Sequence, residues 1–335
     1  MDRLVEAIRR FDNPSVVGLD PTTALLPAPL LAQARDTAGA TNTIKGRALW
    51  AASVAAQFVD FNQSVINAVK DIVPAVKVQI AMYEALGPVG VSAYVETCRA
   101  ANQAGLYVIG DIKRGDIGST AAAYASHLSG IPCPDSEIST SATEKELRSF
   151  PWYEDSVTVN PYLGSDGIMP FVDAAQQSDK DIFVLVRTSN PSSDEFQELI
   201  TDDNRRVYEQ VADKVVQWGS DTVGEQGFSR VGAVVGATHP SVGASLRARM
   251  PQAMFLIPGY GAQGGTASDV AAMFDVHGEG AIVNSSRGII GAWRTDPACN
   301  SQLSVEDALQ LVGKHARRAA LDMRDSLNTA LKERS

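Results

Sequence analysis

The chain contains 335 residues, of which 44% are hydrophobic and 20% are charged, and its formal net charge is −10. This composition is typical of a globular protein that is long enough to bury a large core. Lysine and arginine are not gathered into blocks, which argues against nucleic-acid binding because phosphate neutralisation requires a basic face. No apolar run approaches the length of a membrane span, and no apolar signal-peptide core follows Met1. We therefore expect neither export nor membrane insertion.

The cysteines and histidines do not form a metal-binding pattern. Cys98, Cys133 and Cys299 are far apart, and the four histidines show no spacing that suits a metal site. We therefore expect no metal site of this kind, and we expect the protein to be cytoplasmic, where thiols stay reduced.

Short apolar segments rich in β-branched residues alternate along the chain with longer segments of helical period. The predicted strands are 16–20, 75–80, 107–113, 156–160, 182–188, 231–237, 254–258 and 281–285. The clearest predicted helices are 50–71, 92–103, 203–218 and 270–275, followed by an amphipathic helix over 305–331.

Strands that alternate with helices imply parallel pairing through right-handed crossovers. Eight such units predict one (β/α)8 TIM barrel, a single domain over residues 1–335 that the C-terminal helix closes. An open, doubly wound sheet is the alternative, but the first predicted strand ends in Gly18-Leu19-Asp20-Pro21 and not in a dinucleotide-binding glycine motif. Segments 21–48 and 129–154 are unusually long connections, which we expect to be loop insertions at the C-terminal rim. Lids and inert surface loops fit them equally well.

The polar residues best suited to catalysis or binding lie at the C-terminal ends of predicted strands, which a barrel gathers into one mouth. This convergence favours an active site over scattered turns. The residues are Asp20, Lys77, Asp111, Lys113, Asp116, Asn160, 187–190, Gln263 and Arg287.

The segment at the end of the third predicted strand surrounds one ammonium group with two carboxylates. Asp111 and Lys113 are two residues apart and share one face of the strand, whereas Asp116 falls in the turn or helix start that follows. Local chemistry alone leaves another interpretation open, in which Asp116 merely caps a helix that begins near Ile117.

Glycine-rich segments follow the last two predicted strands, at 258–265 and 284–288, and the second contains Arg287. In barrels, the loops after strands seven and eight commonly bind phosphate, because glycine lets backbone N–H groups approach the oxygens and arginine binds them bidentately. We therefore expect a phosphorylated substrate.

These residues closely resemble the orotidine 5′-phosphate decarboxylase family, whose signature is an apolar pair followed by D-x-K-x-x-D-[IV]-x-x-T. Residues 108–120 satisfy the whole signature. The resemblance covers most of the barrel, from 18–20 through Lys77 to Arg287. The long first loop and the 186–191 run look like the larger, divergent bacterial branch of the family, type 2.

The resemblance implies a carboxy-lyase that converts orotidine 5′-phosphate to uridine 5′-phosphate and CO2 in pyrimidine biosynthesis. Lys77, Asp111, Lys113 and Asp116 of the partner subunit would form an alternating charge array, with Lys113 as proton donor to C6 of the pyrimidine. Asp116 and Thr120 would reach across a homodimer interface, and neither a metal nor an organic cofactor would be needed. The implied substrate-binding residues are Asp20 and Lys77 for the ribose, Asn160 for the pyrimidine edge, and Gln263 with Arg287 for the phosphate.

Two alternatives stay open. Related sugar-phosphate decarboxylases and aldolases arrange a similar Asp-x-Lys-x-x-Asp element around Mg²⁺, and a barrel can also bind a nucleotide without catalysing a reaction. The presence of Asp20, Lys77 and Thr120 favours the nucleotide decarboxylase, and activity that survives a chelator would separate it from the magnesium enzymes.

Overall fold

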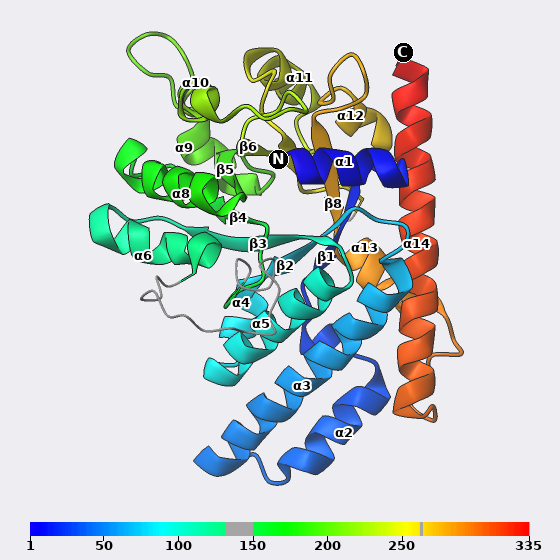
Figure 1. The fold of residues 1–335 in the computed structure, drawn as a ribbon. Coiled ribbons are helices and arrows are strands. Elements are labelled where there is room, and N and C mark those ends of the chain that lie inside the picture. Colours follow the sequence, from blue (N-terminus) through cyan, green and yellow to red (C-terminus); the bar gives the residue numbers. More distant parts are fainter. Residues whose placement is uncertain (131–149, 262–263, 335) are drawn as a thin grey trace, which may run out of the picture.

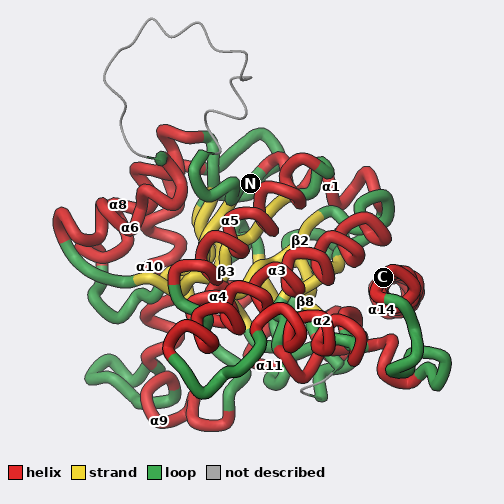
Figure 2. Tube along the Cα trace, turned by 90° about the horizontal axis from the view of Figure 1, so that it is seen from below, coloured by secondary structure: helices red, strands yellow, loops and turns green. Residues whose placement is uncertain are grey.

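The computed structural model describes residues 1–130, 150–261 and 264–334. Its eight strands pair in parallel in chain order, and β1 also pairs with β8, so that the sheet closes into a barrel (Figures 1 and 2). The predicted barrel is confirmed, and the open sheet is wrong because Ser15 of β1 lies in register with Val283 of β8. The strands are β1 (Ser15–Leu19), β2 (Ala75–Gln79), β3 (Tyr107–Arg114), β4 (Ser156–Val159), β5 (Asp181–Arg187), β6 (Val231–Val235), β7 (Phe255–Ile257) and β8 (Ala281–Ser285).

Helices surround the strands, as Figure 1 shows. Each predicted helical segment overlaps a helix of the structure. No helix among the described residues is both long and apolar enough to cross a bilayer. The helices are α1 (Asp2–Phe11), α2 (Ala28–Ala38), α3 (Ile44–Val69), α4 (Ile80–Glu84), α5 (Pro88–Gln103), α6 (Gly118–Ser129), α8 (Ser165–Ser178), α9 (Asp194–Gln197), α10 (Val207–Gly219), α11 (Pro240–Arg249), α12 (Ala267–Ala271), α13 (Arg287–Ile290) and α14 (Val305–Arg334).

The segment 21–48 is not the irregular loop that its length suggests. It contains α2 and the first residues of α3, and these two helices lie side by side (Figure 1). Leu30 and Ala34, four residues apart on one face of α2, are fully buried. Most of the second expected insertion, 129–154, falls in 131–149, outside the described residues.

Helix α1 closes the N-terminal end of the barrel. Arg3 Nη1 donates to Asp155 Oδ1 at 2.8 Å, just before β4 begins. The mouth that can receive a ligand is therefore the opposite end, where the strands finish. Leu4 and Val5 of α1, with Met1 just before it, pack on the inward-facing layer of the strands, which includes Val16, Ala75, Tyr107, Ile109, Phe183, Leu256 and Ile282.

Candidate functional site

Strand alternation places polar side chains directly above this apolar inner layer. Side chains two residues apart in a strand point to the same face, and Ala75 and Tyr107 belong to the barrel interior. Lys77 and Gln79 therefore continue the inward face of β2, and Asp111 continues that of β3.

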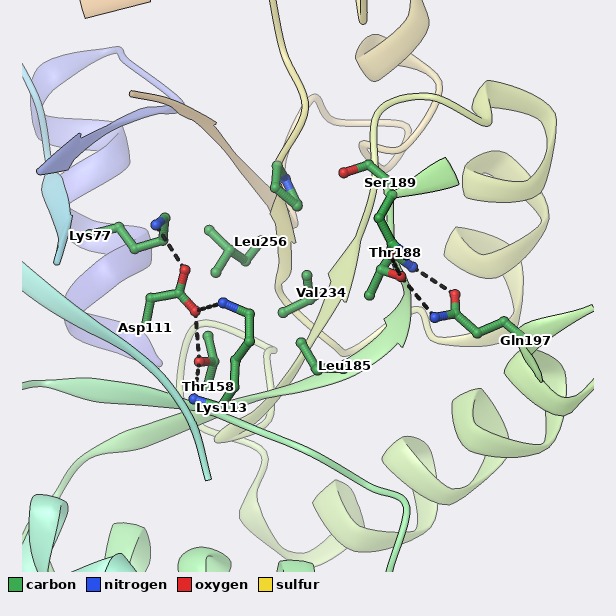
Figure 3. A pocket seen from close by; sticks show the side chains of 12 residues that line it. Lys77, Asp111, Lys113, Thr158, Leu185, Thr188, Ser189, Gln197, Val234 and Leu256 are labelled. Atoms are coloured by element: carbon green, nitrogen blue, oxygen red, sulfur yellow. Dashed lines mark hydrogen bonds and ion pairs between the residues drawn. The ribbon is translucent and has the colours of Figure 1, made fainter. Parts of the chain in front are cut away.

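The carboxylate of Asp111 accepts hydrogen bonds from four side chains, of which Figure 3 shows Lys77, Lys113 and Thr158. Lys77 Nζ lies 2.9 Å from Oδ2, and Gln79 Nε2 lies 2.8 Å from the same oxygen. Lys113 Nζ and Thr158 Oγ1 both donate to Oδ1, the threonine at 2.9 Å. Two ammonium groups thus flank a carboxylate that is only 7% exposed.

These contacts keep Asp111 and Lys77, which are both buried, in their charged forms. Burial alone would raise the pKa of Asp111, but the charges of Lys77 and Lys113 outweigh it, and the pKa lies well below its usual range. Burial likewise acts to lower the pKa of Lys77, whereas Asp111 and Asp20 raise it more strongly, so that the pKa lies above its usual range. Both groups therefore remain charged at neutral pH.

Lys113 reaches the cluster from an uncommon backbone conformation. Its φ is +48°, in the left-handed region, and the β3–β4 register shifts between Gly110 and Arg114. Its backbone N–H donates to Thr158 Oγ1 at 3.0 Å. Such irregularities re-aim a side chain at the end of a strand. The Lys113 side chain is 45% exposed, against 6% for Lys77, so it can meet a ligand from the mouth.

Two cavities meet at this cluster and share Lys77, Asp111 and Pro258. The first, here called the β5 cavity, has a volume of about 420 Å³. Apolar side chains lie between its charged and polar walls, as the close view shows (Figure 3). Its remaining lining residues are Lys113 and Thr158 at the charged wall, Leu185, Val234 and Leu256 between the walls, and Thr188, Ser189, Asn190 and Gln197 at the polar wall.

The second cavity, here called the β8 cavity, has a volume of about 460 Å³ and is suited to an anion. Arg287 and Arg294 both line it, and neither guanidinium forms an ion pair within the described residues. Asp20, which lines this cavity, accepts from Ser286 Oγ at 2.7 Å and from Lys77 Nζ at 3.4 Å, so it connects the β8 cavity to the charged cluster. Free guanidinium groups beside a charged cluster can bind phosphate oxygens bidentately.

Residues 14–300 match the family described as orotidine 5′-phosphate decarboxylase / HUMPS. The chain belongs to this family. It is 43% identical over 294 residues to an orotidine 5′-phosphate decarboxylase of Rhodopirellula baltica, covering 88% of this chain and 89% of that protein. An orotidine 5′-phosphate decarboxylase of Clostridium acetobutylicum is 38% identical, covering 81% of this chain and 85% of the relative. The solved OMP decarboxylase of Leishmania donovani superposes with a TM-score of 0.67 at 28% identity, covering 99% and 98% of the two chains.

Several residues that the family resemblance implies are found together at the mouth. Asp20, Lys77, Asp111 and Lys113 form one connected chain of ion pairs. Arg287 lies in the adjoining β8 cavity. The expected charge array is therefore present within one chain, apart from Asp116.

Asp116 does not join that array within this chain. In the described part of the molecule it forms no ion pair with either lysine, and its Oδ1 accepts the backbone N–H of Ile117 at 2.8 Å. Helix α6 begins at Gly118 with Ile117 at the N-cap position and no side-chain cap, so the interpretation of Asp116 as a helix cap is wrong. Thr120 is exposed on the same helix.

Asn160 is not directed into either cavity. It is exposed after β4, and its Oδ1 accepts the backbone N–H of Tyr162 at 3.0 Å. The lining residues of the two cavities do not include Asn160. Gln263 lies outside the described residues.

Several residues of the site escaped the sequence analysis. Gln79 and Thr158 could have been found, because each lies two positions from a residue that was singled out and therefore shares its face. Gln197 and Arg294 carried no such signal, since they lie in the connections after β5 and β8, where no periodicity predicts orientation.

Proposed function

We propose that this protein is an orotidine 5′-phosphate decarboxylase, a carboxy-lyase that forms uridine 5′-phosphate and CO2 in pyrimidine biosynthesis. The observation that carries the proposal is the single carboxylate of Asp111, held between the ammonium groups of Lys77 and Lys113 at the barrel mouth. Relatives named for this activity cover most of the chain.

The chemistry requires a fixed positive charge beside C6 of the substrate. Loss of CO2 from C6 leaves an electron pair in the plane of the orotate ring, where the π system of the ring cannot delocalise it. A preorganised ammonium stabilises such a charge without reorganising. Lys113 supplies that charge and then donates its proton to C6, and water restores the proton to the amine. Asp111 orients Lys113 and lies beside the departing carboxylate.

The two cavities divide the nucleotide between them. Arg287 holds the phosphate in the β8 cavity, and Asp20 with Lys77 holds the ribose where the cavities meet. The pyrimidine enters the β5 cavity, and we assign its outer edge to the polar wall there instead of to Asn160. Binding energy from the phosphate can offset the cost of bringing a second carboxylate near Asp111.

The direct test is an ultraviolet assay of orotidine 5′-phosphate loss by the purified protein with EDTA present. We expect turnover that the chelator does not change, because both Asp111 oxygens already accept hydrogen bonds from ammonium groups. Turnover only of a sugar phosphate, and only with Mg²⁺, would support the alternative enzyme instead. Nucleotide binding without any turnover would support a non-catalytic barrel.

We also propose a homodimer in which Asp116 and Thr120 act on the neighbouring subunit's site. The support is an exposed apolar surface beside Asp116, where Tyr162 is 84% and Leu163 46% exposed. Ile117, the residue after Asp116, is 53% exposed, and α6 packs on α8. Exposed large apolar side chains gathered near one segment are typical of an interface between subunits.

Mixing two inactive variants tests the shared site. Lys113→Ala and Asp116→Ala homodimers are each expected to be inactive, whereas exchanged heterodimers would contain one intact site. Random exchange would restore about a quarter of the wild-type activity. If Asp116 acts within its own chain, no mixture recovers activity.

We place the protein in the cytoplasm. Cys98 and Cys299 are both free thiols, and Cys98 is buried, which suits a reducing compartment. Cell fractionation with an antibody to the protein tests this location, and recovery outside the cytoplasmic fraction would contradict it.

A further inference from the structure

Arg187, the last residue of β5, is a buried guanidinium for which the proposed reaction has no direct role. Its side chain is 1% exposed. Nη2 donates to Asp194 Oδ1 at 2.6 Å and lies 3.2 Å from Glu198 Oε1, so two carboxylates compensate its charge. A buried charge is costly unless it is paired and hydrogen-bonded. The groups that this guanidinium contacts indicate a specific role for it.

The guanidinium joins the connections that follow two neighbouring strands. After β5, Nη1 donates to the Thr188 carbonyl at 3.1 Å and to the hydroxyl of Ser193. After β6, Nη2 lies 3.2 Å from His239 Nε2, which must accept because a guanidinium has only donors. The ring of Tyr208 in α10 lies 5.9 Å from the guanidinium carbon. Arg187 therefore links the connections after β5 and β6 beneath the rim of the barrel.

The same guanidinium fixes the polar wall of the β5 cavity through Gln197. Arg187 Nη1 donates to Gln197 Oε1 at 3.2 Å, and the backbone N–H of Thr188 donates to that oxygen at 2.9 Å. Two donors on one oxygen determine which way the amide faces. Gln197 Nε2 then donates to Thr188 Oγ1 at 2.8 Å, and Thr188 Oγ1 donates to Asn190 Oδ1 at 2.6 Å.

We propose that Arg187 is a positioning residue that sets the Thr188–Gln197 wall to recognise the pyrimidine edge of the nucleotide. The inference rests on the proposed function, since it assumes that a base occupies the β5 cavity. The orientation of Gln197 leaves its second amide proton for a carbonyl oxygen of the ring. Arg187 itself lies behind the wall and does not touch the ligand.

The geometry requires arginine and not simply a positive charge. The two terminal nitrogens of the guanidinium serve separate groups, Nη1 the wall and Nη2 the carboxylates and His239. A lysine ammonium is one point charge and cannot span both sets of partners. Arg187→Lys is therefore expected to keep the positive charge but to lose some of the hydrogen bonds that hold the polar wall.

Gly236 offers an independent way to disturb the same wall. Its backbone N–H donates to the Arg187 carbonyl at 2.7 Å. A Cβ added there would lie 2.8 Å from the backbone nitrogen and 3.0 Å from the Cα of Ser189. Because backbone atoms cannot rotate away, Gly236→Ala must shift Ser189, a lining residue whose atoms are the three nearest to the added Cβ.

The experiment compares two ligands by calorimetry, uridine 5′-phosphate and ribose 5-phosphate, on the wild type and each variant. Arg187→Met and Gly236→Ala should weaken uridine 5′-phosphate binding by about tenfold or more, because base hydrogen bonds are lost. Ribose 5-phosphate binding should stay within about twofold of wild type, because Arg287, Asp20 and Lys77 are unchanged. The affinity of Arg187→Lys for uridine 5′-phosphate should lie between those of the wild type and Arg187→Met.

A structural role alone would give a different pattern. Equal weakening of both ligands, or unchanged binding of both by a folded Arg187→Met variant, would overturn the inference. If Arg187→Met does not fold, Gly236→Ala decides the result by the same comparison. Failure of the proposed function is distinguishable, because wild-type protein would then lack decarboxylase activity or show no preference for uridine 5′-phosphate over ribose 5-phosphate.

Discussion

Thr158 Oγ1 donates a hydrogen bond to Asp111 Oδ1 at 2.9 Å and accepts one from the backbone N–H of Lys113 at 3.0 Å. One hydroxyl on β4 thus orients both the central carboxylate and the backbone that carries the proposed proton donor. Since Lys113 has a positive φ, this contact helps to hold a conformation that few non-glycine residues adopt.

Thr158→Val should therefore damage catalysis more than binding. Valine keeps the shape of the side chain but removes both hydrogen bonds, so we expect kcat to fall by about 10- to 100-fold. Steady-state kinetics with orotidine 5′-phosphate measure the effect. Thr158→Ser retains the hydroxyl and is the matched control, with activity near that of wild type. Equal kcat values for the valine and serine variants would contradict this role of the hydroxyl.

Lys113→Ala should abolish turnover while the protein still binds the nucleotide. The variant loses both the charge beside C6 and the proton donor, and we expect the rate to fall by about a thousandfold or more. Binding of uridine 5′-phosphate, measured by calorimetry, should remain detectable because Arg287 and Asp20 are unchanged. Normal turnover by Lys113→Ala would remove this lysine from the mechanism.

Arg287→Ala should weaken nucleotide capture with the charge array intact. Loss of a bidentate contact to phosphate is expected to raise KM by about 10- to 100-fold. Arg318→Ala is the matched control, because that side chain is 83% exposed on α14 and away from both cavities. Unchanged affinity for uridine 5′-phosphate in Arg287→Ala would reject the phosphate assignment.

The sequence predicts the barrel and the charged cluster because both follow from short-range rules. Alternation within a strand puts Asp111 and Lys113 on one face, and parallel closure collects strand ends at one mouth. Lys77 forms ion pairs with Asp111 and Asp20 because the register between neighbouring strands brings these three residues to the same level of the barrel.

Residues beyond the strand ends could not be predicted in the same way. Asn160 follows β4 as the rule requires, yet its side chain bonds the Tyr162 backbone and does not line a cavity. Gln197 lies ten residues beyond Arg187 and enters the β5 cavity through contacts with that arginine. Tertiary contacts, and not the chain's periodicity, decide these orientations.

The charge of Asp111 should be visible in the pH dependence of stability. Burial acts to raise its pKa, but Lys77 and Lys113 lower it to well below the unfolded value of about 3.9. The unfolded state then binds more protons in acid, so the carboxylate contributes stability above about pH 4 that is lost as the pH falls towards the folded pKa. Asp111→Asn should flatten the acid limb of the stability curve, measured by urea unfolding at a series of pH values.

A second buried carboxylate supplies a control of opposite sign. Burial raises the pKa of Asp181 above its usual value, although the Met1 amino group and Tyr107 act against the shift. Its contribution is therefore present below the unfolded pKa and is lost as the pH rises through the folded pKa. Asp181→Asn should accordingly steepen the loss of stability in acid, whereas Asp111→Asn should reduce it. If stability in acid changes in the same direction in both variants, the assigned charge of Asp111 is contradicted, because a carboxylate held ionised and one held neutral by burial contribute with opposite signs.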